Sequence, residues 1–463
     1  MRSAPRSLLA AICCAIALAS PATAARLSAA QHAETLAIWK KMVSIPTVQG
    51  RGQMPVMADY VADLLRKGGF AVEDVIVEGS GDATTVAARY RGTGKTGKPI
   101  LLSGHMDVVE ARASDWTRDP FTPVEENGYL YGRGVLDMKF GNAVMVFTLL
   151  KLKQEGFRPS RDIILLLSGD EETEMLTTQR LAKQYGVAEL LLNADGGGGL
   201  LDPQGKPVAF YVQGAEKTYA DFEVTITNPG GHSSRPHADN AIYDLALAID
   251  RIAAYQFPAQ TNELTKAYWS ATGKLVGGKL GNAMQAFAAN PDDKAALATL
   301  RAEPEYVGIT GTTCVATMLS GGHALNALPQ KASVSVNCRI FPGVSIESVK
   351  AKLTEVIANP KATITTLGAP VASDASPLRP DLMKALRKGV DLSFPGLPII
   401  PQMSAGATDS LYFRALGIPS YGVIGMFIKP EDDFSHGLNE RAPIASIDPA
   451  LLLMRSLLLD LAK

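Results

Sequence analysis

Histidine and acidic side chains follow four apolar segments of this 463-residue chain, and together they could bind metal ions. Neutral imidazole and carboxylate groups bind zinc, and two imidazoles with three or more carboxylates suit one zinc ion or a pair. Adjacent carboxylates repel one another, so consecutive acids at the end of an apolar run favour a bound cation. The candidate groups, in chain order, are His105 with Asp107, Glu171 with Glu172, Asp195, and His436.

A further carboxylate, Asp137, comes just before an apolar-rich segment that predicts a helix over about 139–153. An acid in this place is commonly an N-cap, whose side chain accepts a hydrogen bond from the first helical turn. The other interpretation is a carboxylate that bridges two metal ions. From this residue alone, both interpretations remain open.

The apolar segments read as short buried strands that alternate with helices, beginning with Ile100–Leu102 and the run IILLL at 163–167. This alternation predicts an α/β fold with a mostly parallel central sheet and helices on both faces. In such sheets, ligands bind beyond the carboxyl ends of the strands. We therefore expect the candidate side chains to meet at one edge of the sheet.

The chain changes character between about 214 and 368, where the pattern of elements is β-α-β-β-α-β. This order is typical of an α+β ferredoxin-like domain, and its position predicts a domain inserted into the first one. Residues 256–310 lengthen its first crossover and are expected to be helical, because so long a structureless loop is uncommon. The expected first domain then comprises residues 25–213 and 369–463.

The composition indicates a folded protein and gives no sign of two common kinds of partner, nucleic acids and anionic membranes. Hydrophobic residues make up 46% of the chain, enough for a sizeable core, and the net charge of -1 gives no reason to expect nucleic acid or an anionic membrane. Residues 1–24 combine basic residues, a short apolar run and the small-residue pattern Ala22–Thr23–Ala24, which predicts a signal peptide cleaved near Ala24. We expect a periplasmic or secreted protein with no membrane association after cleavage.

Two cysteines, Cys314 and Cys338, remain after removal of the signal peptide. If the strands expected over 312–319 and 331–340 form a hairpin centred on Asn326, these cysteines lie opposite each other. Directly opposed antiparallel residues are within reach of a disulfide, and export would permit the bond.

Eight motifs resemble those of the dinuclear zinc metallopeptidases, a family that includes aminoacylase, carboxypeptidase G, succinyl-diaminopimelate desuccinylase and carnosinase. The resemblance spans nearly the whole mature chain and implies a catalytic domain with two Zn²⁺ ions. It also implies a smaller lid domain that often forms a homodimer, and Co²⁺ or Mn²⁺ are alternative metals. The motifs, in order, are LLSGHMDVV, GRGVLDMK, SGDEE, NADGG, GGHSSRP, NALP, NCRIFPG and FSHG.

The resemblance also implies a metal-ligand set. Asp137 resembles the carboxylate that bridges both metals, His105 and Asp195 resemble the remaining ligands of one zinc, and Glu172 and His436 those of the other. Members of the family often have a cis peptide bond after the bridging aspartate.

Five further residues resemble catalytic and substrate-binding groups of the family. Glu171 resembles the general base, and Asp107 the carboxylate behind the first histidine ligand. His232 resembles the histidine that polarises the scissile carbonyl, in dimeric members within the partner subunit's site. Asn326 and Arg339 resemble contacts to a substrate carboxylate.

The expected function is an exported zinc hydrolase that cleaves dipeptides or short peptides with a free C-terminal carboxylate, acting as a homodimer through the lid domain. An N-acyl-amino-acid deacylase is the alternative within the same chemistry. A catalytically inactive peptide- or metal-binding protein is the alternative from another class. Because a binding protein has no need of Glu171, its presence favours an enzyme.

Overall fold

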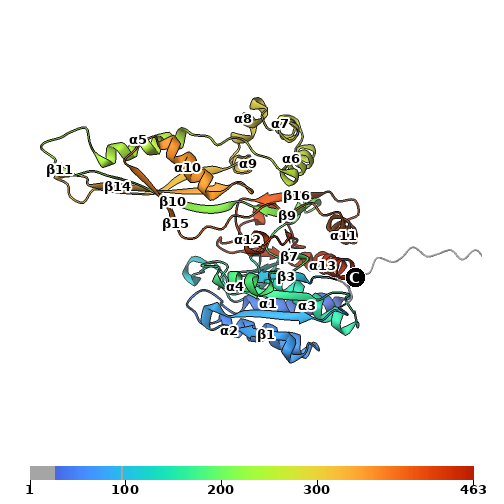
Figure 1. Ribbon diagram of the computed structural model, residues 1–463. Helices are drawn as coiled ribbons and strands as arrows, with labels where there is room; N and C mark the ends of the chain where they lie inside the picture. The colour runs from blue at the N-terminus through green and yellow to red at the C-terminus, as the bar shows by residue number, and fades with distance from the viewer. Residues whose placement is uncertain (1–26, 95–96) are drawn as a thin grey trace, which may run out of the picture.

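The computed structural model describes residues 27–94 and 97–463, so the predicted signal peptide lies outside the described residues. Figure 1 shows a large α/β body and an elongated arm that projects from it to one side. Within the described residues, no helix is long and apolar enough to span a membrane.

The body is built on a ten-stranded sheet whose centre is parallel, as the sequence predicts. Four buried strands form this centre in the order β6 (Ile163–Ser168), β3 (Ile100–His105), β7 (Leu190–Asn193) and β17 (Ser420–Gly422). Antiparallel neighbours extend the sheet on either side. The remaining strands are β1 (Val75–Glu78), β2 (Thr85–Tyr90), β8 (Gly198–Leu201), β9 (Pro207–Glu216), β16 (Ile399–Ser404) and β18 (Phe427–Ile428).

Helices cover both faces of this sheet, because successive side chains of a buried strand point to opposite sides. Leu102 and Leu165 pack into the larger core with five helices, whereas Leu101 and Leu166 pack against two helices on the other face. The first group comprises α1 (Ala29–Val43), α2 (Met54–Lys67), α3 (Lys139–Gln154), α11 (Pro380–Asp391) and α13 (Ile447–Leu461), and the second α4 (Leu176–Tyr185) and α12 (Ser410–Ala415).

The arm is a separate four-stranded antiparallel sheet in the order β12-β14-β10-β15, which is the strand order of a ferredoxin-like domain. Its two helices pack on one face, where Phe222, Val224 and Ile226 alternate with more exposed residues. A short pair of strands, β11 (Gly231–His232) and β13 (Ala327–Leu328), forms the tip. The other elements are β10 (Thr218–Thr227), α5 (Ala241–Ala254), β12 (Thr313–Gly321), β14 (Lys331–Ile340), α10 (Ile346–Ile357) and β15 (Ala362–Leu367).

A disulfide joins Cys314 of β12 to Cys338 of β14, with a Cα separation of 4.1 Å. The two residues are direct partners in the strand register, as the hairpin hypothesis predicts. The register shifts between Ala316 and Met318, so the simple hairpin count holds only for the half of the strands near the cysteines.

The expected helical insertion forms α6 (Glu263–Val276), α7 (Gly278–Ala289), α8 (Lys294–Arg301) and α9 (Pro304–Val307). Trp269 and Phe287 of this insertion share an apolar cluster with Ala209 of β9 and Ile400 of β16. The insertion therefore packs on the sheet of the body, although the chain enters and leaves it from the arm. Nothing in the sequence pattern indicated this packing.

Candidate metal centre

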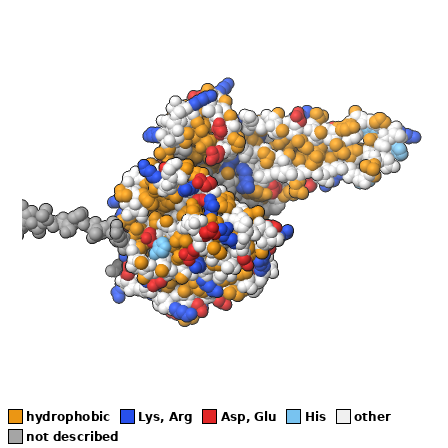
Figure 2. All heavy atoms as spheres, turned by 180° about the vertical axis from the view of Figure 1, so that it is seen from behind, with side chains coloured by type: hydrophobic (Ala, Val, Ile, Leu, Met, Phe, Trp, Pro, Cys, Tyr) orange, Lys and Arg blue, Asp and Glu red, His pale blue; other side chains and the backbone are white. Residues whose placement is uncertain are grey.

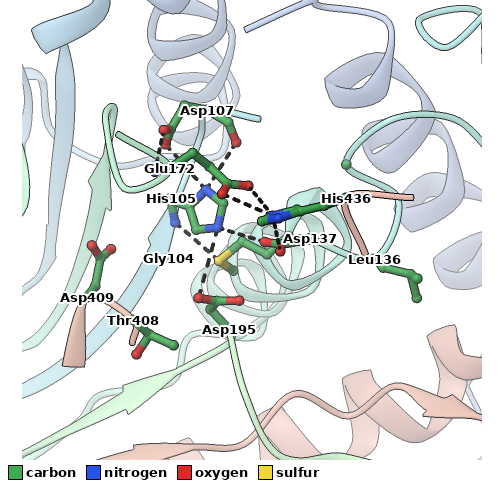
Figure 3. A network of polar contacts seen from close by, with 12 residues as sticks. Gly104, His105, Asp107, Leu136, Asp137, Glu172, Asp195, Thr408, Asp409 and His436 are labelled. Carbon is green, nitrogen blue, oxygen red and sulfur yellow. Dashed lines mark hydrogen bonds and ion pairs between the residues drawn. The ribbon is translucent and has the colours of Figure 1, made fainter. Parts of the chain in front are cut away.

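Five predicted ligands converge at the carboxyl edge of the parallel strands (Figure 3). Asp137 lies between the two histidines: its Oδ1 is 2.9 Å from His105 Nε2, and its Oδ2 is 3.2 Å from His436 Nε2. Asp195 Oδ2 lies 4.0 Å from His105 Nε2, and Glu172 Oε2 lies 3.0 Å from His436 Nε2. Donors about 2.0–2.2 Å from a shared zinc are themselves roughly 3–3.5 Å apart, and three of these four distances are in or close to that range. His105, Asp137 and Glu172 each offer a donor atom within 4.8 Å of the other two, so the cluster could hold a metal ion.

The backbone around these ligands explains how they come together. His105 ends β3, and Asp195 follows β7, its neighbour in the sheet. The peptide bond between Asp137 and Met138 is cis, and α3 begins at Lys139 with no side-chain cap. Asp137 therefore does not act as an N-cap, and its carboxylate is turned toward the two histidines.

The electrostatics of the cluster favour added positive charge. Burial disfavours a charged His105, but hydrogen bonds with Asp107 and Asp137 raise its pKa well above the usual range. Hydrogen bonds with Asp137 and Glu172 raise the pKa of His436 to about 10. Burial, together with the charge of Asp137, raises the pKa of Asp195. The carboxylates thus stabilise the protonated form of both histidines. Divalent cations would supply the same positive charge in place of these protons.

Two further acids adjoin the ligands. The Nδ1 atom of His105 faces Asp107, 3.0 Å from its carbonyl oxygen and 3.3 Å from Oδ1, so the other ring nitrogen is directed at the cluster. Glu171 makes no side-chain hydrogen bond or ion pair with any described residue, yet it interacts electrostatically with His105, Asp195 and Glu172. Burial raises its pKa well above the usual range. Glu171 is thus a free carboxyl group beside the ligands.

The structure adds two acids that the sequence interpretation missed. Glu440 is fully buried and accepts hydrogen bonds from the amides of Gly134, at 3.0 Å, and Leu136, at 2.7 Å, which fixes the loop that carries Asp137. Asp409 accepts a hydrogen bond from Ser168 Oγ at 2.8 Å, and burial raises its pKa to about 6. The mostly apolar segment 399–403, with Gln402 as its polar member, is followed by polar residues and could have indicated Asp409. No sequence signal indicated Glu440.

The three residues expected from the arm lie in two different places. His232 is exposed at the tip, and the Asn326 carbonyl oxygen accepts a hydrogen bond from the neighbouring Ser233 amide at 3.0 Å. Arg339 lies near the opposite end of β14, where its Nη1 donates to the Ala405 carbonyl of the body at 3.0 Å. The strand between them extends over about 26 Å at roughly 3.3 Å per residue. Within the described residues, neither His232 nor Asn326 contacts the ligand cluster of its own chain.

Known proteins share both the sequence pattern and the fold of this chain. Residues 101–460 match the model of peptidase family M20/M25/M40. The chain is 29% identical over 369 residues to the human N-fatty-acyl-amino acid synthase/hydrolase PM20D1, covering 76% of this chain and 72% of that protein. Two solved structures share the fold: an M20 family metallo-carboxypeptidase from Sulfolobus solfataricus and human carnosine dipeptidase 1.

The first of these superposes with a TM-score of 0.67 at 20% identity and covers 92% of this chain and 98% of its own. The second has a TM-score of 0.60 at 16% identity and covers 94% and 97%. The matched range includes all five clustered ligands and Glu171. The chain belongs to peptidase family M20/M25/M40, and it is a metal-dependent hydrolase of the peptidase or amidase type.

Proposed function

We propose that this protein is a dinuclear zinc hydrolase that cleaves short peptides with a free C-terminal carboxylate. The observation that carries the proposal is the placement of Asp137 between two histidines, each with its own second carboxylate, while Glu171 stays unpaired beside them. The donor set of nitrogen and oxygen atoms fits zinc, with cobalt or manganese as alternatives.

Two divalent cations in this site would polarise the scissile carbonyl and lower the pKa of an attacking water. The residues of the chain supply the remaining steps. Glu171 has no other partner among the described residues, so it is free to accept a proton from the water and return it to the leaving nitrogen. Asp107 holds the ring of His105 in one orientation through its second nitrogen.

Arg339 supports a substrate that ends in a carboxylate. Its guanidinium lies at the junction of arm and body, 4.6 Å from the centre of the Tyr219 ring. Among the described residues, its one hydrogen bond is to the carbonyl oxygen of Ala405. A guanidinium has five N–H donors and binds a carboxylate through two parallel hydrogen bonds. The remaining donors of Arg339 are therefore available to a carboxylate bound between the two parts.

A homodimer would complete the site. The tip residues His232 and Asn326 are remote from the cluster of their own chain, so in this arrangement of arm and body they could act only in a second copy. The outer strand β12 has one unpaired edge, and apolar side chains are exposed along it and along α5 (Figure 2). These are Val315, Met318 and Leu319 of β12, and Ile242, Tyr243 and Leu247 of α5.

A deacylase of N-acyl amino acids is the second candidate, favoured by the name of the human relative. Both substrate classes release an amino acid with a free carboxylate, so both would use Arg339. The predicted signal peptide supports a periplasmic or secreted location.

Replacement of Glu171 by Gln tests the proposal. We expect the purified, zinc-loaded variant to keep about two zinc ions per chain, as measured by elemental analysis, because Glu171 is not a ligand. Its kcat on dipeptides should fall by about 10³-fold or more, the upper part of the range for losing a general acid–base. Retention of activity, or loss of zinc along with it, would contradict the assigned role.

A further inference from the structure

A chain of buried hydrogen bonds connects Asp195, at the metal centre, to the start of the arm. The amide of Asp195 donates to Asn193 Oδ1 at 2.9 Å, and Asn193 Nδ2 donates to Thr408 Oγ1 at 3.0 Å. Thr408 Oγ1 in turn donates to Glu216 Oε1 at 2.5 Å. Glu216 is the last residue of β9, and the arm begins with β10 at Thr218. Figure 3 shows Thr408 near Asp195.

The direction of each hydrogen bond in this chain is determined by the groups at its ends. A carboxylate can only accept, so the hydroxyl of Thr408 donates to Glu216 and is left to accept from the side-chain amide of Asn193. The carbonyl oxygen of Asn193 therefore faces the amide of Asp195. Asn193 is 0% exposed and Glu216 1%, so water does not replace these partners.

Stability alone does not account for the charge at the arm end of the chain. Arg414 Nη2 lies 3.1 Å from Glu216 Oε1, and both side chains are buried. Within the described residues, the second carboxylate oxygen of Glu216 and the three guanidinium nitrogens of Arg414 make no hydrogen bond. Such a pair contributes little net stability compared with apolar side chains of similar volume. This favours a role in holding Thr408 in place.

The loop that carries Thr408, between β16 and α12, is also attached to the arm. The carbonyl of Ser404 accepts a hydrogen bond from the Lys217 amide at 3.1 Å, and the carbonyl of Ala405 accepts one from Arg339 Nη1 at 3.0 Å. One end of the loop is thus bonded to the arm, and the other end, through Asn193, to the segment that presents a metal ligand.

We propose that Thr408 is a positioning residue, which fixes the backbone of Asp195 relative to the start of the arm through Asn193 and Glu216. This role rests on the proposed function, because Asp195 is taken as a ligand of one of the two zinc ions. Among the described residues, no hydrogen bond joins Thr408 to the ligands assigned to the other ion. Loss of the Thr408 hydroxyl should therefore weaken one zinc site and spare the other.

Thr408→Val tests this role in the full chain, because it removes the hydroxyl and keeps the shape of the side chain. Asn193 keeps its hydrogen bond to Ser410 Oγ, and Glu216 keeps the one from Gln213, so the variant should fold. In competition with a chelator, one zinc ion should bind about 10- to 100-fold more weakly, and the other as in the wild type. Thr408→Ser retains the hydroxyl and should restore both affinities.

The kinetics provide a second readout. At saturating zinc, kcat of Thr408→Val on free-acid dipeptides should fall by about 10- to 100-fold, because a small misplacement of the reacting groups is costly. KM should change little, because Arg339 is unaltered. Thr35→Val is the matched control: Thr35 is 0% exposed, and its hydroxyl donates only within α1, to the Gln31 carbonyl at 2.9 Å. This control should keep both zinc affinities and kcat.

A lower melting temperature of Thr408→Val with both zinc affinities unchanged would assign Thr408 to the fold alone and overturn the proposal. Equal weakening of both ions, or failure of Thr408→Ser to restore binding, would also overturn it. Thr408→Ala repeats the test if the added methyl group of valine prevents folding. If the wild type binds two zinc ions but cleaves no peptide, the proposed function fails, whereas the zinc affinities of the variants still decide the role of Thr408.

Discussion

At the scale of single residues, Arg339 is the strongest test of the carboxylate requirement. Replacing it by Ala or Lys should reduce kcat/KM on free-acid dipeptides by at least about 100-fold, or about 2.7 kcal/mol, because lysine cannot form the two parallel hydrogen bonds. The loss should nearly vanish for substrates with an amidated C-terminus. Lys331→Ala, at the far end of the same strand, serves as the control. Equal cleavage of amidated and free-acid substrates by the wild type would rule out this role.

Glu440 gives a second residue-scale prediction. Its carboxylate binds the amides of the loop that presents Asp137, and it pairs with Arg133 Nη1 at 2.7 Å. Glu440→Gln replaces one acceptor oxygen by an NH₂ group. This group would face the N–H groups that donate to the carboxylate in the wild type, so hydrogen bonds would be lost. Zinc affinity, measured by competition with a chelator, should weaken by about 10- to 100-fold, the usual effect of losing an outer support. An unchanged affinity would show that the loop is held without this contact.

The chemistry of single residues decides which of them could be found from the sequence. His105, Asp195 and Glu172 stand out because polar side chains follow apolar strands, and the ends of parallel strands meet at one edge. Glu440 binds mainly backbone amides that are distant in sequence, so its role exists only after the loops have folded. A single sequence carries no pattern for such a contact.

At the scale of elements, the alternation of strands and helices was sufficient to predict the parallel centre of the sheet. The extension formed by β9 and β16 was missed, because these strands flank the inserted domain and pair across a gap of nearly two hundred residues. The packing of the insertion was missed for a related reason. Its apolar face, which includes Trp269, indicates that the helices pack against another part of the protein but not which part. The contacting residue Ile400 belongs to β16, which is distant in the sequence.

The junction between arm, insertion and body contains a buried lysine that gives a pH prediction. Lys217 is 1% exposed, and its Nζ donates to the Gly308 carbonyl at 2.7 Å and to Thr313 Oγ1 at 3.2 Å. Burial lowers its pKa to about 7, and the charge of Arg339 acts in the same direction. In the unfolded chain, the lysine keeps its normal pKa near 10.4.

Between about pH 7 and 10, the unfolded state therefore binds more protons at Lys217 than the folded state, and stability rises with pH. Below this window both states are protonated, and the contribution no longer changes. Lys217→Met should remove this pH-dependent contribution to stability. The melting temperature of the variant should therefore rise less than that of the wild type between pH 7 and 9.5. Lys384→Met, at an exposed helix position, should follow the wild type. Parallel curves for Lys217→Met and wild type would contradict the lowered pKa.

At the scale of the whole molecule, His232 can take part in the reaction only through a second copy if the arm keeps the position that it has in the structure. The tip lies at the far end of the arm from the body (Figure 1), and β14 alone spans about 30 Å at roughly 3.3 Å per residue. A dimer formed by the β12 edge and α5 would have twofold symmetry, so each tip would face the other subunit.

Mixing two inactive variants tests this arrangement. His232→Ala leaves the metal centre intact, and Glu171→Gln leaves the tip intact, so a mixed dimer contains one complete site. After unfolding and refolding together in equal amounts, random association should restore about a quarter of wild-type activity, because half of the dimers are mixed and each has one working site of two. The double variant mixed with wild type should show only about a quarter of full activity, from the wild-type dimers, because a mixed dimer then has no complete site. If the two single variants remain inactive together while forming mixed dimers in native mass spectrometry, His232 does not act across the interface, and the tip must reach the cluster of its own chain by a large movement of the arm.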